Sequence, residues 1–290
     1  MEIRNIQKTG DMHYLYLPTS WCREHKISSK SKVSIDHSSE GKLIVSPHIV
    51  EKKKKHLKFS VAEDDLDIIN KLVVACYINP VSSFEINLEK GIEFAKLLHQ
   101  KRLISLESVE IDRKQITCHS SVIVSDPDSL LKTMVKKIKN MITVMLEGYD
   151  KELIDKYEEE IDRSKMHIDK SIISSLTFDH ASKLKSIDLY YISLISKDLE
   201  RMVDHLICLN PEEKEFLHWL HLVVDQLQAI LENPQSLNQK SALNFMKTVS
   251  KMTGFTVKDI KTYDKERIRL SMTMVVEVIT DWAITHELEG

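Results

Sequence analysis

The spacing of hydrophobic positions changes near Asp128. Before that residue, short runs in which polar and apolar residues alternate, such as Lys32 to Asp36, are typical of strands with one buried face. After it, apolar residues recur every three or four positions, as they do along one face of a helix. The pattern predicts a multi-domain, mainly helical protein whose β structure is confined to the N-terminal part.

Residues 1–50 are expected to form a small β module with one short helix. Gly10 and Gly41 supply turns, because glycine adopts positive φ without steric cost. Thr19 or Ser20 is expected to cap the helix. So small a unit buries little apolar surface, which predicts an intertwined homodimer. The expected strands are 3–7, 13–17, 32–36 and 43–45, and the expected helix is 21–25.

Residues 57–122 are expected to form an α+β linker domain in the order strand, helix, strand, helix and terminal hairpin. This order favours a small open sheet with helices on one face, related to ferredoxin-like folds. No glycine-rich phosphate loop occurs in it, so nucleotide binding is not expected. The expected strands are 57–61, 83–88, 105–111 and 115–120, and the expected helices are 62–76 and 92–101.

Residues 127–290 are expected to form a helical domain with six helices. Breaks are expected at Gly148, near Asp179-His180, at Asn210-Pro211, at Asn233-Pro234 and at Thr253-Gly254. Two consecutive groups of three helices, 127–210 and 211–290, indicate a tandem three-helix repeat. The expected helices are 128–147, 150–175, 181–209, 212–232, 236–252 and 257–287.

The composition is that of an ordinary globular protein, with 42% hydrophobic and 29% charged residues. The longest apolar run, Leu72 to Ile78, is far shorter than a bilayer-spanning helix, and the N-terminus lacks a signal-peptide pattern. A cytoplasmic protein without membrane insertion is therefore expected. Four scattered cysteines are read as small core residues: Cys22, Cys76, Cys118 and Cys208.

Charge is distributed unevenly along the chain. Residues 1–56 carry 11 Lys/Arg and 6 Asp/Glu, whereas residues 128–290 carry 22 and 27. A basic end on an acidic body favours a polyanionic partner at that end. The alternative is a solvated linker, because Lys52 to Lys55 supply four of those positive charges.

Pairs of carboxylates four residues apart lie on consecutive expected helices. Glu200 and Asp204 share one flank of their helix, and Glu158 and Asp162 occupy the corresponding flank of the preceding helix. Like charges at this spacing cost a helix about 0.2–0.5 kcal/mol. Two such pairs at equivalent positions favour a bound hard or borderline cation.

The alternative is an ordinary solvated acidic flank. Lys165, Lys197 and Arg201 lie near enough in sequence to neutralise it, and Asp198 belongs either to the same patch or to a separate one. The last helix repeats the spacing with a third pair, Glu277 and Asp281.

The sequence does not favour an enzyme. A ferritin-like di-metal site needs Glu-x-x-His on two helices, and the chain offers one, Glu215 with His218. His218 and the nearby His221 are read as surface or groove histidines instead. No Gly-x-Ser-x-Gly nucleophile elbow occurs either.

The N-terminal module resembles the SpoVT/AbrB swapped-hairpin family. The resemblance lies in Ile6 to Gly10, Tyr14 to Trp21 with its Leu-Pro strand end, Lys32-Val33, and Gly41 to Val45. It implies a dimer that binds DNA through basic residues on strands and loops. The corresponding candidates are Arg4, Lys8, Arg23 and Lys26.

The helical body resembles the PhoU family over about residues 125–290. Tyr191 to Leu209, with its Leu-Glu-Arg-x-x-Asp-His core, is similar to the signature helix, and Glu158 to Arg163 is similar to the preceding acidic helix. The resemblance implies tandem three-helix bundles that regulate phosphate uptake negatively, together with phosphate transporter components. It also implies a divalent or iron-type metal ion at the acidic motifs. An AbrB-like module ahead of a PhoU-like body is similar to an arrangement in archaea.

Carried over to this chain, the metal site would use Glu158, Asp162, Glu200 and Asp204. Glu277 and Asp281 are weaker candidates, because the partner helix at 243–247 has no carboxylates. The predicted function is a phosphate-responsive, DNA-binding regulator. The alternatives are an AbrB-type transcription factor that senses a different signal, and a metal-binding adaptor that does not bind DNA.

Overall fold

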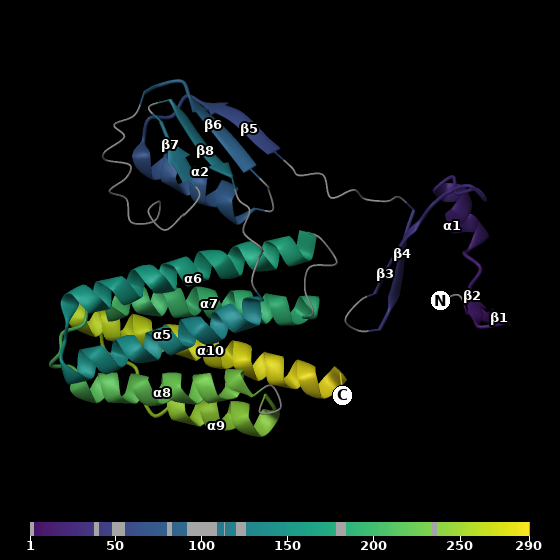
Figure 1. The fold of residues 1–290 in the computed structure, drawn as a ribbon. Helices are drawn as coiled ribbons and strands as arrows, with labels where there is room; N and C mark the ends of the chain where they lie inside the picture. The colour runs from purple at the N-terminus through teal and green to yellow at the C-terminus, as the bar shows by residue number, and fades with distance from the viewer. Residues whose placement is uncertain are drawn as a thin grey trace. The chain divides into compact units, whose positions relative to one another are not determined.

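A computed structural model describes residues 3–37, 41–47, 56–79, 83–91, 109–112, 114–119, 126–177, 184–233 and 237–289. The chain divides into two compact units, residues 1–53 and residues 54–290 (Figure 1). In the described residues, no helix combines the length and the apolar character that crossing a bilayer requires.

The N-terminal unit consists of two antiparallel hairpins and a short helix. Positive φ angles at Gly10 (61°) and Gly41 (75°) confirm both expected glycine turns. The helix begins at Thr19 behind Pro18 and has no side-chain cap, so the expected capping by Thr19 or Ser20 is wrong. The elements are β1 (Gln7–Thr9), β2 (Met12–Tyr14), α1 (Thr19–Glu24), β3 (Ser34–His37) and β4 (Leu43–Ser46).

None of the described residues in this unit is buried. Large apolar side chains remain in contact with water, and Ile3 and Ile6 are 82% and 68% exposed. The unit therefore does not enclose a core within one chain, as expected for so few residues. The remaining exposed apolar side chains are Met12, Tyr14, Leu15, Tyr16, Ile35 and Leu43.

The second unit begins with a four-stranded sheet. Its strand order is β5-β6-β8-β7, with β5 and β6 parallel and the other pairs antiparallel. This order differs from the expected ferredoxin-like arrangement, in which another strand separates the two parallel strands of the split βαβ unit. The elements are β5 (His56–Val61), α2 (Leu66–Ile78), β6 (Ser83–Leu88), β7 (Val109–Ile111) and β8 (Gln115–His119). The expected helix at 92–101 lies outside the described residues.

Helix α2 covers one face of this sheet. Asp65 begins the helix, because its side chain accepts hydrogen bonds from the backbone N–H groups of Asp67 and Ile68. Ile69 and Val73 on α2 share a core with Ile86 on β6. Met166, from the helical body, belongs to the same core, so α2 lies against the helices (Figure 1).

The cysteines agree with the sequence reading only in part. Cys76 and Cys118 are buried in the sheet core, as expected. Cys22 is half-buried, and Cys208 is exposed, so the expectation of a core residue is wrong for Cys208. All four are free thiols.

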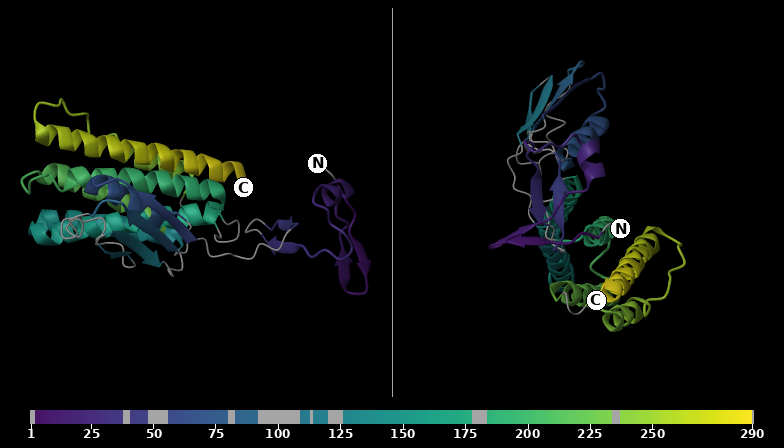
Figure 2. Two further views of the ribbon diagram at one scale, coloured as in Figure 1. Left: turned by 90° about the horizontal axis from the view of Figure 1, so that it is seen from above. Right: turned by 90° about the vertical axis from the view of Figure 1, so that its right-hand side faces the viewer.

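From residue 126 onward, the part of the chain that the structure describes forms six helices, as the sequence predicted, and they run side by side (Figures 1 and 2). Local signals set several of the ends. Asp126 caps the first helix ahead of Pro127, Gly148 ends it, and Asn238 caps the fifth helix. The expected break at Asp179-His180 lies outside the described residues. The helices are α5 (Pro127–Glu147), α6 (Lys151–Thr177), α7 (Ser186–Leu206), α8 (Lys214–Glu232), α9 (Gln239–Val249) and α10 (Ile260–Glu289).

The six helices share one hydrophobic core. Helix α7 packs against α10, and α5 packs against α8, so each of these pairs joins the first group of three helices to the second. The two predicted triplets therefore do not have separate cores. Helices α6 and α7 also pack against each other, and this pair positions the acidic motifs.

Candidate metal centre

The buried faces of α6 and α7 determine the direction in which the acidic side chains point. Ile161 on α6 and Leu199 on α7 are fully buried in the shared core. Asp162 and Glu200 follow these residues by one position, which rotates them by about 100° around their helices. Both carboxylates therefore lie at the edge of the α6–α7 contact and are half-buried.

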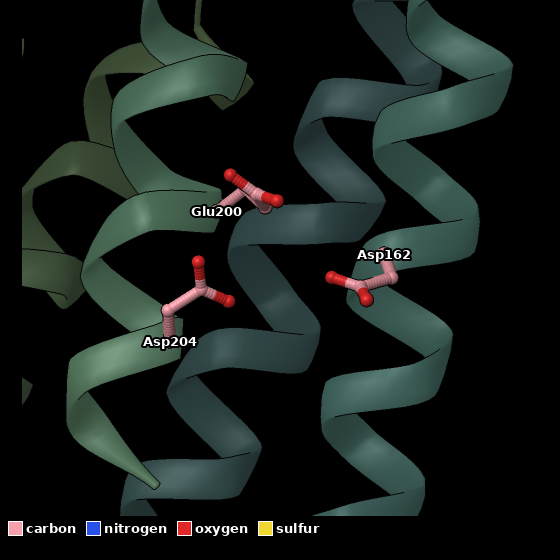
Figure 3. Close-up of side chains that lie close together, drawn as sticks. All are labelled: Asp162, Glu200 and Asp204. Atoms are coloured by element: carbon pink, nitrogen blue, oxygen red, sulfur yellow. The ribbon is translucent and has the colours of Figure 1, made fainter. Parts of the chain in front are cut away.

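Three carboxylates meet at that edge. One oxygen each from Asp162, Glu200 and Asp204 lies within 4.8 Å of the others. Figure 3 shows Glu200 and Asp204 on one helix, one turn apart, with Asp162 facing them from the neighbouring helix. Asp204 is exposed, so the group is open to solvent on one side.

This donor set fits a hard cation. Oxygen ligands lie about 2.0–2.1 Å from Mg²⁺ and 2.3–2.6 Å from Ca²⁺, so ligands on opposite sides of one ion are about 4–5 Å apart. The three oxygens, each within 4.8 Å of the others, are no further apart than ligands of one such ion can be. The group contains neither Cys nor His, the usual ligands of structural zinc, so Mg²⁺, Ca²⁺ or Mn²⁺ fits better. Water would complete the coordination on the exposed side.

Two of the cations that could neutralise this acidic edge are paired elsewhere. Lys165 forms an ion pair with Asp169, one turn further along α6. Arg201 is 3.5 Å from Asp198, on the same helix. Burial raises the pKa of Asp198, and the positive charges of Arg201 and Lys197 partly offset this rise. Asp198 therefore belongs to a separate pair and not to the three-carboxylate group.

Glu158, the fourth expected ligand, lies outside the group. It precedes Asp162 by one helical turn, or about 6 Å along the axis. That displacement carries it toward the end of α7, near Cys208. Although Cys208 is exposed as a residue, partial burial of its thiol is the main cause that raises its pKa, and the charges of Asp264, Asp204 and Glu158 add to the rise.

A second polar contact beside the group was not expected from the sequence. His205, next to Asp204, lies 2.9 Å from the buried carboxylate of Asp264 on α10 (Nδ1 to Oδ1). The ring of Tyr263 packs edge-on against His205. No spacing signal connects Asp264 with α7, because the two residues belong to different helix triplets and meet only through packing.

The other candidate residues are not part of a metal-ligand group. Glu277 and Asp281 are exposed on α10, and the three-carboxylate group does not include them. His218 is exposed and His221 is half-buried near Thr143, so the reading of these histidines as surface or groove residues is confirmed. The four basic candidates of the N-terminal unit are all exposed: Arg4, Lys8, Arg23 and Lys26.

No family model, curated protein or solved structure matches the chain. The class of protein is therefore defined by the structure itself. The second unit is a six-helix body with an attached four-stranded sheet, and three carboxylates meet at the α6–α7 edge.

Proposed function

We propose that the chain is a PhoU-like, phosphate-responsive regulator that represses phosphate uptake through DNA binding and contact with the phosphate transport system. The observation that carries the proposal is the meeting of Asp162 with Glu200 and Asp204. Glu200 and Asp204 belong to the segment that resembles the PhoU signature, and Asp162 belongs to the preceding acidic helix. The resemblance and the geometry thus point to the same edge of the body.

A hard divalent cation bound by these three carboxylates would hold α6 to α7. Without it, three carboxylates within 4.8 Å repel one another. The metal-bound form would therefore present a more rigid helix surface to a transporter component.

The N-terminal unit would bind DNA as a homodimer. Its exposed apolar side chains provide a surface that a second copy of the unit would cover. Its net charge of +5 over residues 1–56 and its exposed basic side chains would meet DNA phosphates. Arg23 and Lys26 lie at the end of α1 and just after it, and Lys8 lies on β1.

Deletion of the gene tests the regulatory role. Transcripts of phosphate-transporter genes are expected to rise in the deletion strain under phosphate excess and to fall again when the wild-type chain is restored. A chain carrying Glu200→Gln and Asp204→Asn is expected to restore repression poorly. The matched control carries Glu152→Gln and Glu159→Gln, which remove two exposed carboxylates of α6 that lie outside the three-carboxylate group.

The outcomes separate the three functions. Unchanged phosphate-transporter transcripts together with altered transcripts of other genes would indicate a transcription factor that senses another signal. Metal binding without DNA binding would indicate an adaptor. Either result would reject the proposal.

A further inference from the structure

Helix α10 has two apolar faces. One is buried against α7 and α9 and includes Ile268, Met272 and Ile279. The other faces solvent, and its positions recur in alternating steps of three and four residues. From Tyr263 to Ile284, every exposed residue of α10 belongs to this second face. We call it the α10 stripe, and its members are Ile260, Tyr263, Arg267, Leu270, Met274, Glu277, Asp281, Ile284 and Leu288.

The stripe is more apolar than a solvated helix face. Six of its nine members are large hydrophobic residues, and Met274 and Ile284 are 49% and 44% exposed. In the described residues, α8 and α9 each expose only one such residue, Leu222 and Leu243. Alternating steps of three and four are the spacing of a helix–helix seam. Because α10 already packs inward through its opposite face, the stripe offers a second seam.

The order of residues along the stripe fits a second copy of α10 in antiparallel orientation. In one register, Leu270 faces Met274 of the second copy at the centre. Arg267 then faces Glu277 of the second copy on both sides of that centre. Further out, Tyr263 meets Asp281, and Ile260 meets Ile284. Every charged position thus meets an opposite charge or a hydroxyl donor, and apolar positions meet apolar positions.

Other registers are worse. A shift of one heptad in one direction places Leu270 against Asp281 and Met274 against Glu277. A shift in the other direction places Ile260 against Glu277 and Arg267 against Leu270. Parallel, in-register pairing places Arg267 on Arg267 and Glu277 on Glu277. A charge buried against an apolar side chain is costly, and so are like charges that face each other. The order of charges along α10 therefore selects the antiparallel register with Leu270 against Met274.

The charges at the centre are free to make these contacts. In the part of the chain that the structure describes, Arg267 and Glu277 form no salt bridge with another residue. The neighbours Arg269 and Glu266 bond to each other instead, with 2.7 Å between Nη2 and Oε1. The stripe extends over about 42 Å of helix, long enough for a continuous seam.

We propose that the α10 stripe is a self-association surface, which pairs two copies of the chain through antiparallel α10 helices. The Leu270–Met274 contacts exclude water at the centre, and the Arg267–Glu277 pairs set orientation and register. This surface is distinct from the N-terminal unit. Its test therefore uses a readout that dimerisation of the N-terminal unit does not produce.

Disulfide cross-linking of the full chain provides that readout. In a Cys22→Ser, Cys208→Ser background, the Arg267→Cys, Glu277→Cys double variant is expected to form disulfide-linked dimers under mild oxidation in the presence of chelator. The two cysteines of one chain lie about 15 Å apart along the helix and do not bond to each other. The matched controls are the two single variants, which are expected to stay monomeric on denaturing gels. Absence of dimers from the double variant, or equal cross-linking of a single variant, overturns the proposal.

Charge reversal tests the register without cysteines. Arg267→Glu alone and Glu277→Arg alone are expected to raise the dissociation constant of the α10 contact about tenfold or more, measured by sedimentation equilibrium. The double variant Arg267→Glu, Glu277→Arg is expected to restore association. Leu222→Glu on α8 is the control for an exposed apolar residue outside the stripe and is expected to change nothing. A double variant as weak as the single variants would contradict the proposed register.

Discussion

The indole N–H of Trp282 on α10 donates a hydrogen bond to the carboxylate of Asp188 on α7, with 2.7 Å between Nε1 and Oδ1. The other carboxylate oxygen of Asp188 accepts from the backbone N–H of Lys185 and so caps α7. The ring of Tyr191 stacks on the Trp282 ring. One buried carboxylate thus starts one helix and ties it to a helix of the other triplet.

Replacement of Trp282 by Phe removes the indole N–H. Oδ1 of the buried Asp188 then keeps only the longer contact with His286, 3.3 Å from Nε2. We expect the free energy of unfolding of the helical unit to fall by about 1–3 kcal/mol. Chemical denaturation followed by circular dichroism measures the change. Tyr190→Phe is the control, because Tyr190 is exposed and loss of its hydroxyl is expected to cost less than about 0.5 kcal/mol. Equal effects of both substitutions would contradict the role of the hydrogen bond.

Metal binding predicts a measurable stabilisation. Mn²⁺ or Mg²⁺ at one hundred times its dissociation constant is expected to stabilise the wild-type chain by about 2.7 kcal/mol. The Glu200→Gln, Asp204→Asn variant is expected to lose this gain and to become slightly more stable than the metal-free wild type, since like charges are removed. Thermal unfolding with and without chelator measures both effects.

The control for this experiment is again Glu152→Gln, Glu159→Gln. It also removes two carboxylates, both exposed and outside the group, and is expected to keep the metal-dependent shift. A shift that is absent from the wild type, or present in the Glu200→Gln, Asp204→Asn variant, would reject the site.

Glu266 predicts a dependence of stability on acid. Two hydrogen bonds from Arg269 hold the pKa of Glu266 at about 2, below its ordinary value of 4.5, and the backbone N–H of Phe255 contributes. Because the pKa is lower in the folded state, ionised Glu266 stabilises the folded protein above pH 4.5. This stabilisation is lost as the pH falls toward 2. Glu266→Gln is therefore expected to lower the free energy of unfolding by about 1–3 kcal/mol at neutral pH, and by much less near pH 2.

Chemical denaturation across this pH range measures the effect. Glu212→Gln, an exposed residue ahead of α8, is the control and is expected to leave the pH profile unchanged. A Glu266→Gln variant whose stability differs from the wild type by the same amount at every pH would contradict the linkage.

DNA binding predicts a steep dependence on salt. Affinity for promoter DNA of the phosphate-transporter genes is expected to fall with salt, and loss of one phosphate contact is expected to reduce the slope by about 0.9. Lys8→Ala and Arg23→Ala should each reduce it. Lys251→Ala is the control, because this exposed lysine lies in the second unit. Binding that does not depend on salt, or equal losses in the control, would count against an interface at the N-terminal unit.

Local signals predicted the helical elements well. The turn of Gly148, the cap of Asp126 and the seam of α7 each depend on residues within a few positions of one another. The expected strand at 83–88 agrees with β6 for the same reason. By contrast, the order β5-β6-β8-β7 depends on pairing between distant segments, and the alternation within each strand contains no information on which strand lies next to which.

The sequence by itself determined that Glu200 and Asp204 share a flank, because four residues make almost one turn of a helix. It also placed Arg267, Glu277 and the apolar residues between them along α10 in one repeating pattern. Only the tertiary structure decided that Asp162 joins the first pair while Glu158 does not, and that the α10 stripe faces solvent. The reason is that spacing along a helix fixes the relative direction of its own side chains, whereas the axial register and the rotation of one helix against another are set by packing of the shared core.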